Sequence, residues 1–264
     1  GMRNYFLMGC FCLLLPACMG GEARQEEQAA DTLADTQWLQ GVWLDDNTES
    51  PVFKIKGDSI YYASQINAPL KYDLKNDTLT IYGVETVHYP LERCQEQALQ
   101  FRTPVGDMVS LHKSDNDSAF VALSVTGPEK KEVISKDLAV MYQGKRYRGY
   151  VYINPTSIKV VRPSLTEEGL TMDNVYYDNV IHICVYQGKQ RLYAKDITRQ
   201  MFSSVVPDDY LKMSILSDMD FIGVDAEGYH YLATLCIPDG ASCYNVELTI
   251  DRDDQLSFSS ADVE

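Results

Sequence analysis

The sequence lacks the motifs by which many enzymes are recognised. It contains no Gly-x-Ser-x-Gly nucleophile elbow, no phosphate-binding P-loop and no dinucleotide-binding fingerprint. It has neither a His-x-x-x-His nor a Cys-x-x-Cys spacing, and its four histidines are His88, His112, His182 and His230. From motifs we therefore predict no catalytic residue, no metal and no cofactor. Carboxylate-based hydrolysis stays open, because its two acids come from separate strands and have no signature spacing.

Basic residues are scarce as well. The chain has 23 lysines and arginines against 38 aspartates and glutamates, which gives a formal net charge of −15. Such a surface repels the phosphates of nucleic acid, so we expect no nucleic-acid partner. After residue 17, no run of about 18 consecutive apolar residues occurs, so we expect the rest of the chain to be soluble.

The N-terminal residues have the pattern of an export signal. Arg3 is the only charged residue before Glu22, and residues 5–15 are apolar throughout. This pattern predicts a signal peptide over residues 1–17. The Leu-Pro-Ala-Cys segment that ends at Cys18 resembles the lipobox of bacterial lipoproteins. The resemblance implies that Cys18 is lipidated and that the protein meets the membrane only through this anchor. Residues 18–36 are polar and predict a flexible tether.

Two cysteines near the C-terminus flank a segment whose composition predicts a turn. Cys236 and Cys243 enclose a segment with Pro, Asp, Gly and Ser, which are residues typical of a reversing turn. Facing positions at the mouth of a hairpin are close enough for a disulfide bond. Two buried free thiols explain the same residues equally well.

Turn residues recur about every ten positions, which is typical of antiparallel β-structure. Residues 37–126 predict a small barrel or meander, and the Gly-Pro pair after them, followed by a charged run, marks a boundary. Residues 133–264 predict an antiparallel sheet domain with one or two short helices, near residues 198–204 and after Pro207. The expected fold class is mostly β (α+β).

The first half of the chain resembles the lipocalins. Gly41, Val42 and Trp43 are similar to the Gly-x-Trp start of lipocalin-type barrels. The resemblance implies a lipocalin-like small barrel over residues 37–126 and suggests a carrier of a small apolar ligand. A tryptophan that fills the core of any β-sandwich would give the same three residues.

The second half, residues 138–260, is similar to a family of Bacteroidales lipoproteins known only as a domain of unknown function. The similarity lies in the segment Lys195 to Phe202, in Val206-Pro207-Asp208-Asp209-Tyr210-Leu211-Lys212, and in the closing hairpins. It implies an outer-membrane lipoprotein of the cell envelope and brings no known activity. The segment Asp31-Thr32-Leu33 matches the O-glycosylation pattern of these bacteria, so Thr32 is a candidate glycan attachment site.

Tyrosine is abundant, with 18 residues against 8 phenylalanines. Most tyrosines suit strands and cross-strand pairs. A minority on one open face, together with arginines, could bind a glycan, peptide or protein; this candidate binding face is Tyr147, Tyr150, Tyr152, Arg146 and Arg148. A non-catalytic binding module is therefore our first hypothesis. A lipocalin-like carrier and a carboxylate-dependent hydrolase are the alternatives.

Overall fold

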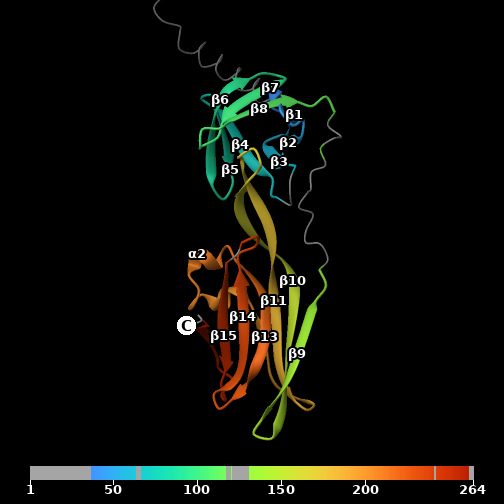
Figure 1. The fold of residues 1–264 in the computed structure, drawn as a ribbon, viewed down its shortest axis with the longest axis vertical. Coiled ribbons are helices and arrows are strands. Elements are labelled where there is room, and N and C mark those ends of the chain that lie inside the picture. The colour runs from blue at the N-terminus through green and yellow to red at the C-terminus, as the bar shows by residue number, and fades with distance from the viewer. Residues whose placement is uncertain (1–36, 64–66, 117–119, 121–130, 241, 262–264) are drawn as a thin grey trace, which may run out of the picture.

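A computed structural model describes residues 37–63, 67–116, 120, 131–240 and 242–261. These residues form antiparallel strands almost throughout, with two short helical segments (Figure 1). A closed barrel comes first and antiparallel sheets follow it, so the predicted mostly β fold class is confirmed. Within the described ranges, no helix is long and apolar enough to cross a membrane.

The barrel has eight strands, each hydrogen-bonded to the next, and the first strand pairs with the last to close it. The strands are β1 (Gly41–Asp45), β2 (Pro51–Lys56), β3 (Ser59–Tyr62), β4 (Leu70–Lys75), β5 (Thr78–Tyr82), β6 (Thr86–Cys94), β7 (Ala98–Arg102) and β8 (Met108–Lys113). The turn between β4 and β5 shows how the sequence sets this path. Asn76 and Asp77 adopt positive φ angles of 53° and 54°, as the tight turn of a two-residue hairpin requires.

Alternation along the barrel strands places the apolar side chains inside. In β4, Leu70 and Leu74 are buried, whereas Lys71 and Lys75 are exposed. Trp43 of β1 is fully buried, and its Nε1 donates a hydrogen bond to the carbonyl oxygen of Leu39 at 2.8 Å. Every barrel strand contributes buried side chains to this core.

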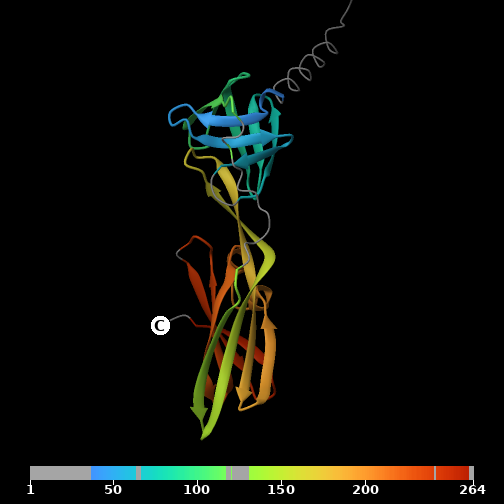
Figure 2. The ribbon, with the colours of Figure 1, turned by 90° about the vertical axis from the view of Figure 1, so that its right-hand side faces the viewer.

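The described strands from residue 134 onward form two four-stranded sheets that pack face to face (Figure 2). The first sheet has the order β12-β11-β10-β9 and the second the order β13-β14-β15-β16. Their strands are β9 (Ile134–Tyr142), β10 (Lys145–Leu165), β11 (Thr171–Gln187), β12 (Gln190–Ile197), β13 (Ile215–Asp225), β14 (Gly228–Cys236), β15 (Cys243–Ile250) and β16 (Leu256–Ser260). The core between the sheets is apolar, and the ring of Phe221 lies so close to Gly149 that a Cβ there would stand 2.1 Å from it.

Two short helical segments connect the sheets. A 3-10 turn, η2 (Arg199–Phe202), and one turn of α-helix, α2 (Asp208–Leu211), lie near the two predicted positions. Arg199 and Asp178 form a buried ion pair, with 3.4 Å between Nε and Oδ2. Asp178 also accepts a hydrogen bond from the backbone N–H of Leu216 at 2.9 Å. These contacts attach the helical connection to both sheets. Burial disfavours the charged carboxylate of Asp178 and so raises its pKa.

The hairpin of β10 and β11 has the two longest strands, and it extends past the other strands of its sheet into the barrel (Figures 1 and 2). Leu170 and Met172, near its tip, belong to the buried core of the barrel. The backbone N–H of Thr171 donates to the hydroxyl of Tyr89 at 2.9 Å, and that of Val84 donates to Oδ2 of Asp173 at 2.9 Å. The hairpin thus joins the barrel to the sandwich of sheets.

Candidate functional site

The predicted binding face lies on strand β10, where side chains alternate between the two sides of the sheet. Val151 and Ile153 point into the sandwich core, so the even-numbered residues of this stretch point outward. Arg146, Arg148, Tyr150 and Tyr152 therefore share the outer side of the sheet. Tyr147 does not, because it packs against the core with its ring 6.1 Å from that of Tyr229.

The neighbouring strand β11 completes an aromatic cluster on this outer side. The rings of Tyr150 and Tyr152 are stacked, with centroids 6.2 Å apart and planes within 3°. Tyr186 meets Tyr150 edge-on at 5.6 Å, and the ring of His182 lies 6.1 Å from that of Tyr152. The register pairs Tyr150 with Cys184, Tyr152 with His182 and Arg148 with Tyr186. We call Arg148, Tyr150, Tyr152, His182 and Tyr186 the tyrosine face; all five are partly exposed.

Arg148 and His182 of the tyrosine face each have an acidic partner on a flanking strand. Arg148 donates a hydrogen bond to Asp137 of β9, and His182 Nδ1 lies 2.7 Å from Asp196 of β12. The thiol of Cys184 is buried in the same part of the sheet, and this burial raises its pKa, which disfavours the nucleophilic thiolate. The arrangement offers contact area and hydrogen bonds, and nothing in it resembles an activated nucleophile.

Sequence reasoning missed Tyr186 and His182 as members of this face, and it placed Tyr147 on the wrong side. The alternation of Val151 and Ile153 with the tyrosines could have separated Tyr147 from Tyr150 and Tyr152. The partners from β11 depend on cross-strand register, which the sequence of one strand does not contain.

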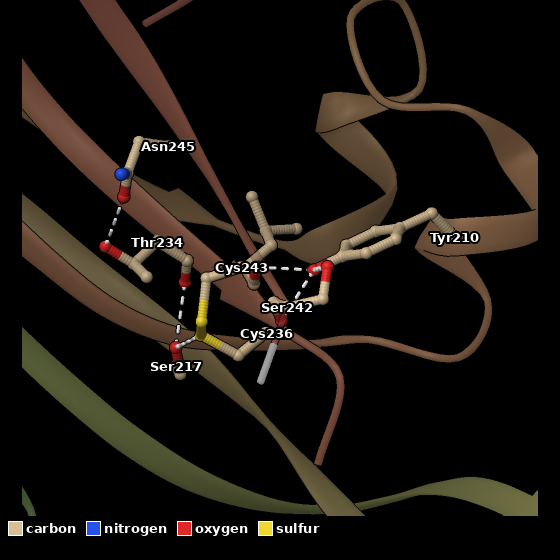
Figure 3. The surroundings of a disulfide bond; sticks show 8 residues. Tyr210, Ser217, Thr234, Cys236, Ser242, Cys243 and Asn245 are labelled. Atoms are coloured by element: carbon tan, nitrogen blue, oxygen red, sulfur yellow. Dashed lines mark hydrogen bonds between the residues drawn. A yellow bond between two sulfur atoms is a disulfide. The ribbon is translucent and has the colours of Figure 1, made fainter. Parts of the chain in front are cut away.

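Cys236 and Cys243 form a disulfide bond at the mouth of the β14–β15 hairpin (Figure 3). The two residues face each other in the strand register, with 4.1 Å between their Cα atoms. The hydroxyl of Tyr210, from α2, donates to the carbonyl oxygen of Ser242 at 2.9 Å (Figure 3). The bond and this contact hold the turn between β14 and β15 in place.

The barrel interior bears on the carrier hypothesis. Fully buried aromatic side chains, including Trp43, Phe53 and Phe101, fill it from several strands. Leu170 and Met172 of the hairpin enter from one end. This packing favours a structural role for the barrel over the carriage of a ligand.

Acidic groups near strand β14 bear on metal binding and on hydrolysis. Asp225, Glu227 and His230 place one possible ligand atom each within 4.8 Å of one another. Both ring nitrogens of the buried His230 are already engaged, Nε2 with Asp225 at 2.7 Å and Nδ1 with Glu247 at 2.9 Å. These contacts are sufficient to explain the cluster as a hydrogen-bonded support of the hairpin.

Three of the sequence predictions concern residues outside the described ranges. They are the signal peptide over residues 1–17, the lipid on Cys18 with its tether, and the glycan on Thr32.

Comparison with known proteins adds one assignment. None of the curated proteins searched matches the chain. The sequence model of one family matches residues 113–258, from the last residue of β8 into β16, the last strand of the sandwich. Since these residues are more than half of the chain, the protein belongs to the family described as a domain of unknown function, DUF4738.

Proposed function

We propose that this protein is a lipid-anchored component of the bacterial outer membrane that acts without catalysis, by binding a partner protein through the tyrosine face. The observation that supports this proposal is the cluster of three tyrosines and a histidine on one partly exposed sheet surface. Tyrosine and arginine are enriched among the residues that dominate binding energy at protein interfaces.

The shape and charge of the face favour a protein over a small ligand. It covers two adjacent strands, β10 and β11, on the outer side of a sheet, so it offers a broad surface. Arg148 and His182 already have acidic partners on the flanking strands, so the face requires no ion from a ligand. Rigid aromatic side chains add contact area at little cost in conformational entropy.

A peptide library displayed on phage would test the proposal with the purified chain. We expect enrichment of binding peptides, and loss of their affinity by at least about 30-fold in the double variant Tyr150→Ala/Tyr152→Ala, since a hot-spot residue contributes about 2 kcal/mol or more. Tyr82→Ala is the matched control, because Tyr82 is an exposed strand tyrosine on the barrel. Enrichment that the double variant retains would contradict the proposal, as would binding on a glycan array with no peptide enriched.

The anchor and the location are separate parts of the proposal. They are supported by the lipobox-like segment before Cys18 and by the apolar residues 5–15. A fatty-acid probe fed to the expressing bacterium should label the protein but not its Cys18→Ser variant. Labelling of that variant to the same extent would refute the anchor. The proposed glycan should add to the mass of the protein, and the Thr32→Ala variant should lose this added mass.

A further inference from the structure

A second surface lies at the waist of the molecule, where the β10–β11 hairpin leaves the sandwich for the barrel. A half-open pocket of about 460 Å³ lies there between the hairpin and the β14–β15 turn. We call it the waist pocket; its wall includes Arg162, Ser164, Leu165, Asn174, Tyr176 and Asp239. Its volume falls within the range of small-molecule sites, about 300–1,000 Å³.

The two sides of the waist pocket are fixed to each other. Arg162 of β10 donates a hydrogen bond to the carbonyl oxygen of Pro238, and the hydroxyl of Tyr176 of β11 donates one to the carboxylate of Asp239. The disulfide bond between Cys236 and Cys243 closes the turn that carries Pro238 and Asp239. Burial, and then Asp239, raise the pKa of Tyr176 to about 12, so the phenol keeps its proton. The pocket is therefore formed before any ligand arrives.

Within the described part of the chain, one buried polar atom in the wall has no hydrogen-bond partner. Asn174 is only 6% exposed, and its Nδ2 donates a hydrogen bond to Ser164 Oγ at 2.8 Å. Its Oδ1 is buried and accepts no hydrogen bond from any residue that the structure describes. A buried acceptor without a donor is unfavourable, so a ligand hydroxyl that donates to Oδ1 once the Asn174 side chain turns toward the pocket would recover this cost.

The charges of the pocket indicate which ligand could do so. Arg162 and Asp239 give it one positive and one negative side chain, so neither an anion nor a cation is favoured as a whole. Arg162 retains N–H groups beyond the one that binds Pro238, since a guanidinium has five. Hydroxyl groups can accept from Arg162 and donate to Asn174 Oδ1 at once. Leu165, 67% exposed, and the ring of Tyr176 offer apolar surface for the C–H face of a sugar.

We infer that the waist pocket binds a small neutral saccharide of one or two sugar rings. Asn174 accepts a hydrogen bond from one hydroxyl, and Arg162 donates to another. This site is independent of the tyrosine face, because it uses a different part of the hairpin, beyond the irregular register between Pro155 and Lys159.

Saturation-transfer NMR on the full chain tests the inference with named probes. The neutral probes are maltose, cellobiose and diacetylchitobiose, and the charged probes are glucuronate and glucosamine. We expect transfer to at least one neutral sugar and weaker transfer to the charged ones. Transfer to no neutral sugar, or to the charged sugars alone, would overturn the inference.

Variants connect the signal to the pocket. Arg162→Ala and Asn174→Ala should each weaken binding by about tenfold, because each removes a hydrogen bond with a buried or charged partner. Arg146→Ala is the matched control, since Arg146 lies on the same strand away from the pocket. Asn174 is buried, so its variant could fail to fold; Leu165→Trp, at an exposed position, should block the pocket without touching the core. Unchanged affinity in both Arg162→Ala and Leu165→Trp would refute the inference.

Discussion

Leu170 provides a test of how far the barrel depends on residues outside its own strands. Its side chain is fully buried in the barrel core, although it lies 57 positions beyond the end of β8 at Lys113. Truncation of a buried leucine to alanine costs about 2–5 kcal/mol, through lost burial and the cavity left behind. We therefore expect Leu170→Ala to lower the free energy of barrel unfolding by about 3 kcal/mol.

The chain provides its own probe for this measurement. Its two tryptophans, Trp38 and Trp43, precede or lie in β1, so tryptophan fluorescence reports on the barrel and not on the sandwich. With a urea m-value of about 2 kcal/mol/M, the midpoint should fall by about 1.5 M. Leu165→Ala is the control, since this residue of the same hairpin is 67% exposed and should change the midpoint little. A fluorescence midpoint unchanged by Leu170→Ala would refute the docking of the hairpin tip.

Three further predictions concern stability. Replacement of Cys236 and Cys243 by alanine reopens a short loop and should cost about 2 kcal/mol, measured by thermal unfolding of the oxidised protein and the variant; equal unfolding temperatures would argue against the bond. Asp178→Ala leaves its buried arginine partner without a carboxylate and should cost about 3–5 kcal/mol in chemical unfolding, so a loss below about 1 kcal/mol would contradict the ion pair. His112 has a pKa raised above its ordinary 6.5, chiefly by the hydrogen bond to an aspartate of the β1–β2 loop. The stability that the His112 interaction adds is therefore fully present below pH 6.5 and is lost as the pH rises through the raised pKa. The barrel of His112→Gln should then differ in stability from the original barrel more at about pH 5.5 than at about pH 9. A stability difference independent of pH would refute this assignment.

Local patterns were enough to predict much of the fold. The alternation in β4 and the turn at Asn76 and Asp77 indicate a hairpin from sequence alone, because both depend on neighbours in the chain. The same holds for α2, where Pro207 and two acids mark the first turn. The disulfide partners also lie close together in sequence.

The hairpin that enters the barrel could not be predicted in the same way. Leu170 follows a Thr-Glu-Glu-Gly sequence that reads as an ordinary exposed turn, and nothing local shows that another part of the chain covers it. The waist pocket could not be predicted for the same reason, since Asn174 and Asp239 line one pocket only after two hairpins have packed. Contacts of this kind depend on the tertiary arrangement and have no periodic signal in the sequence.

The docked hairpin also limits where the chain can be divided into parts that fold separately. The region that matches the family begins at residue 113, so it contains the hairpin tip but leaves out the barrel strands that cover it. A chain cut at that boundary would carry Leu170 and Met172 into water on the end of an extended hairpin. Exposed apolar residues on a strand pair invite association with other chains. Relatives that have lost the barrel should therefore carry polar residues at these two positions or a different cover for them.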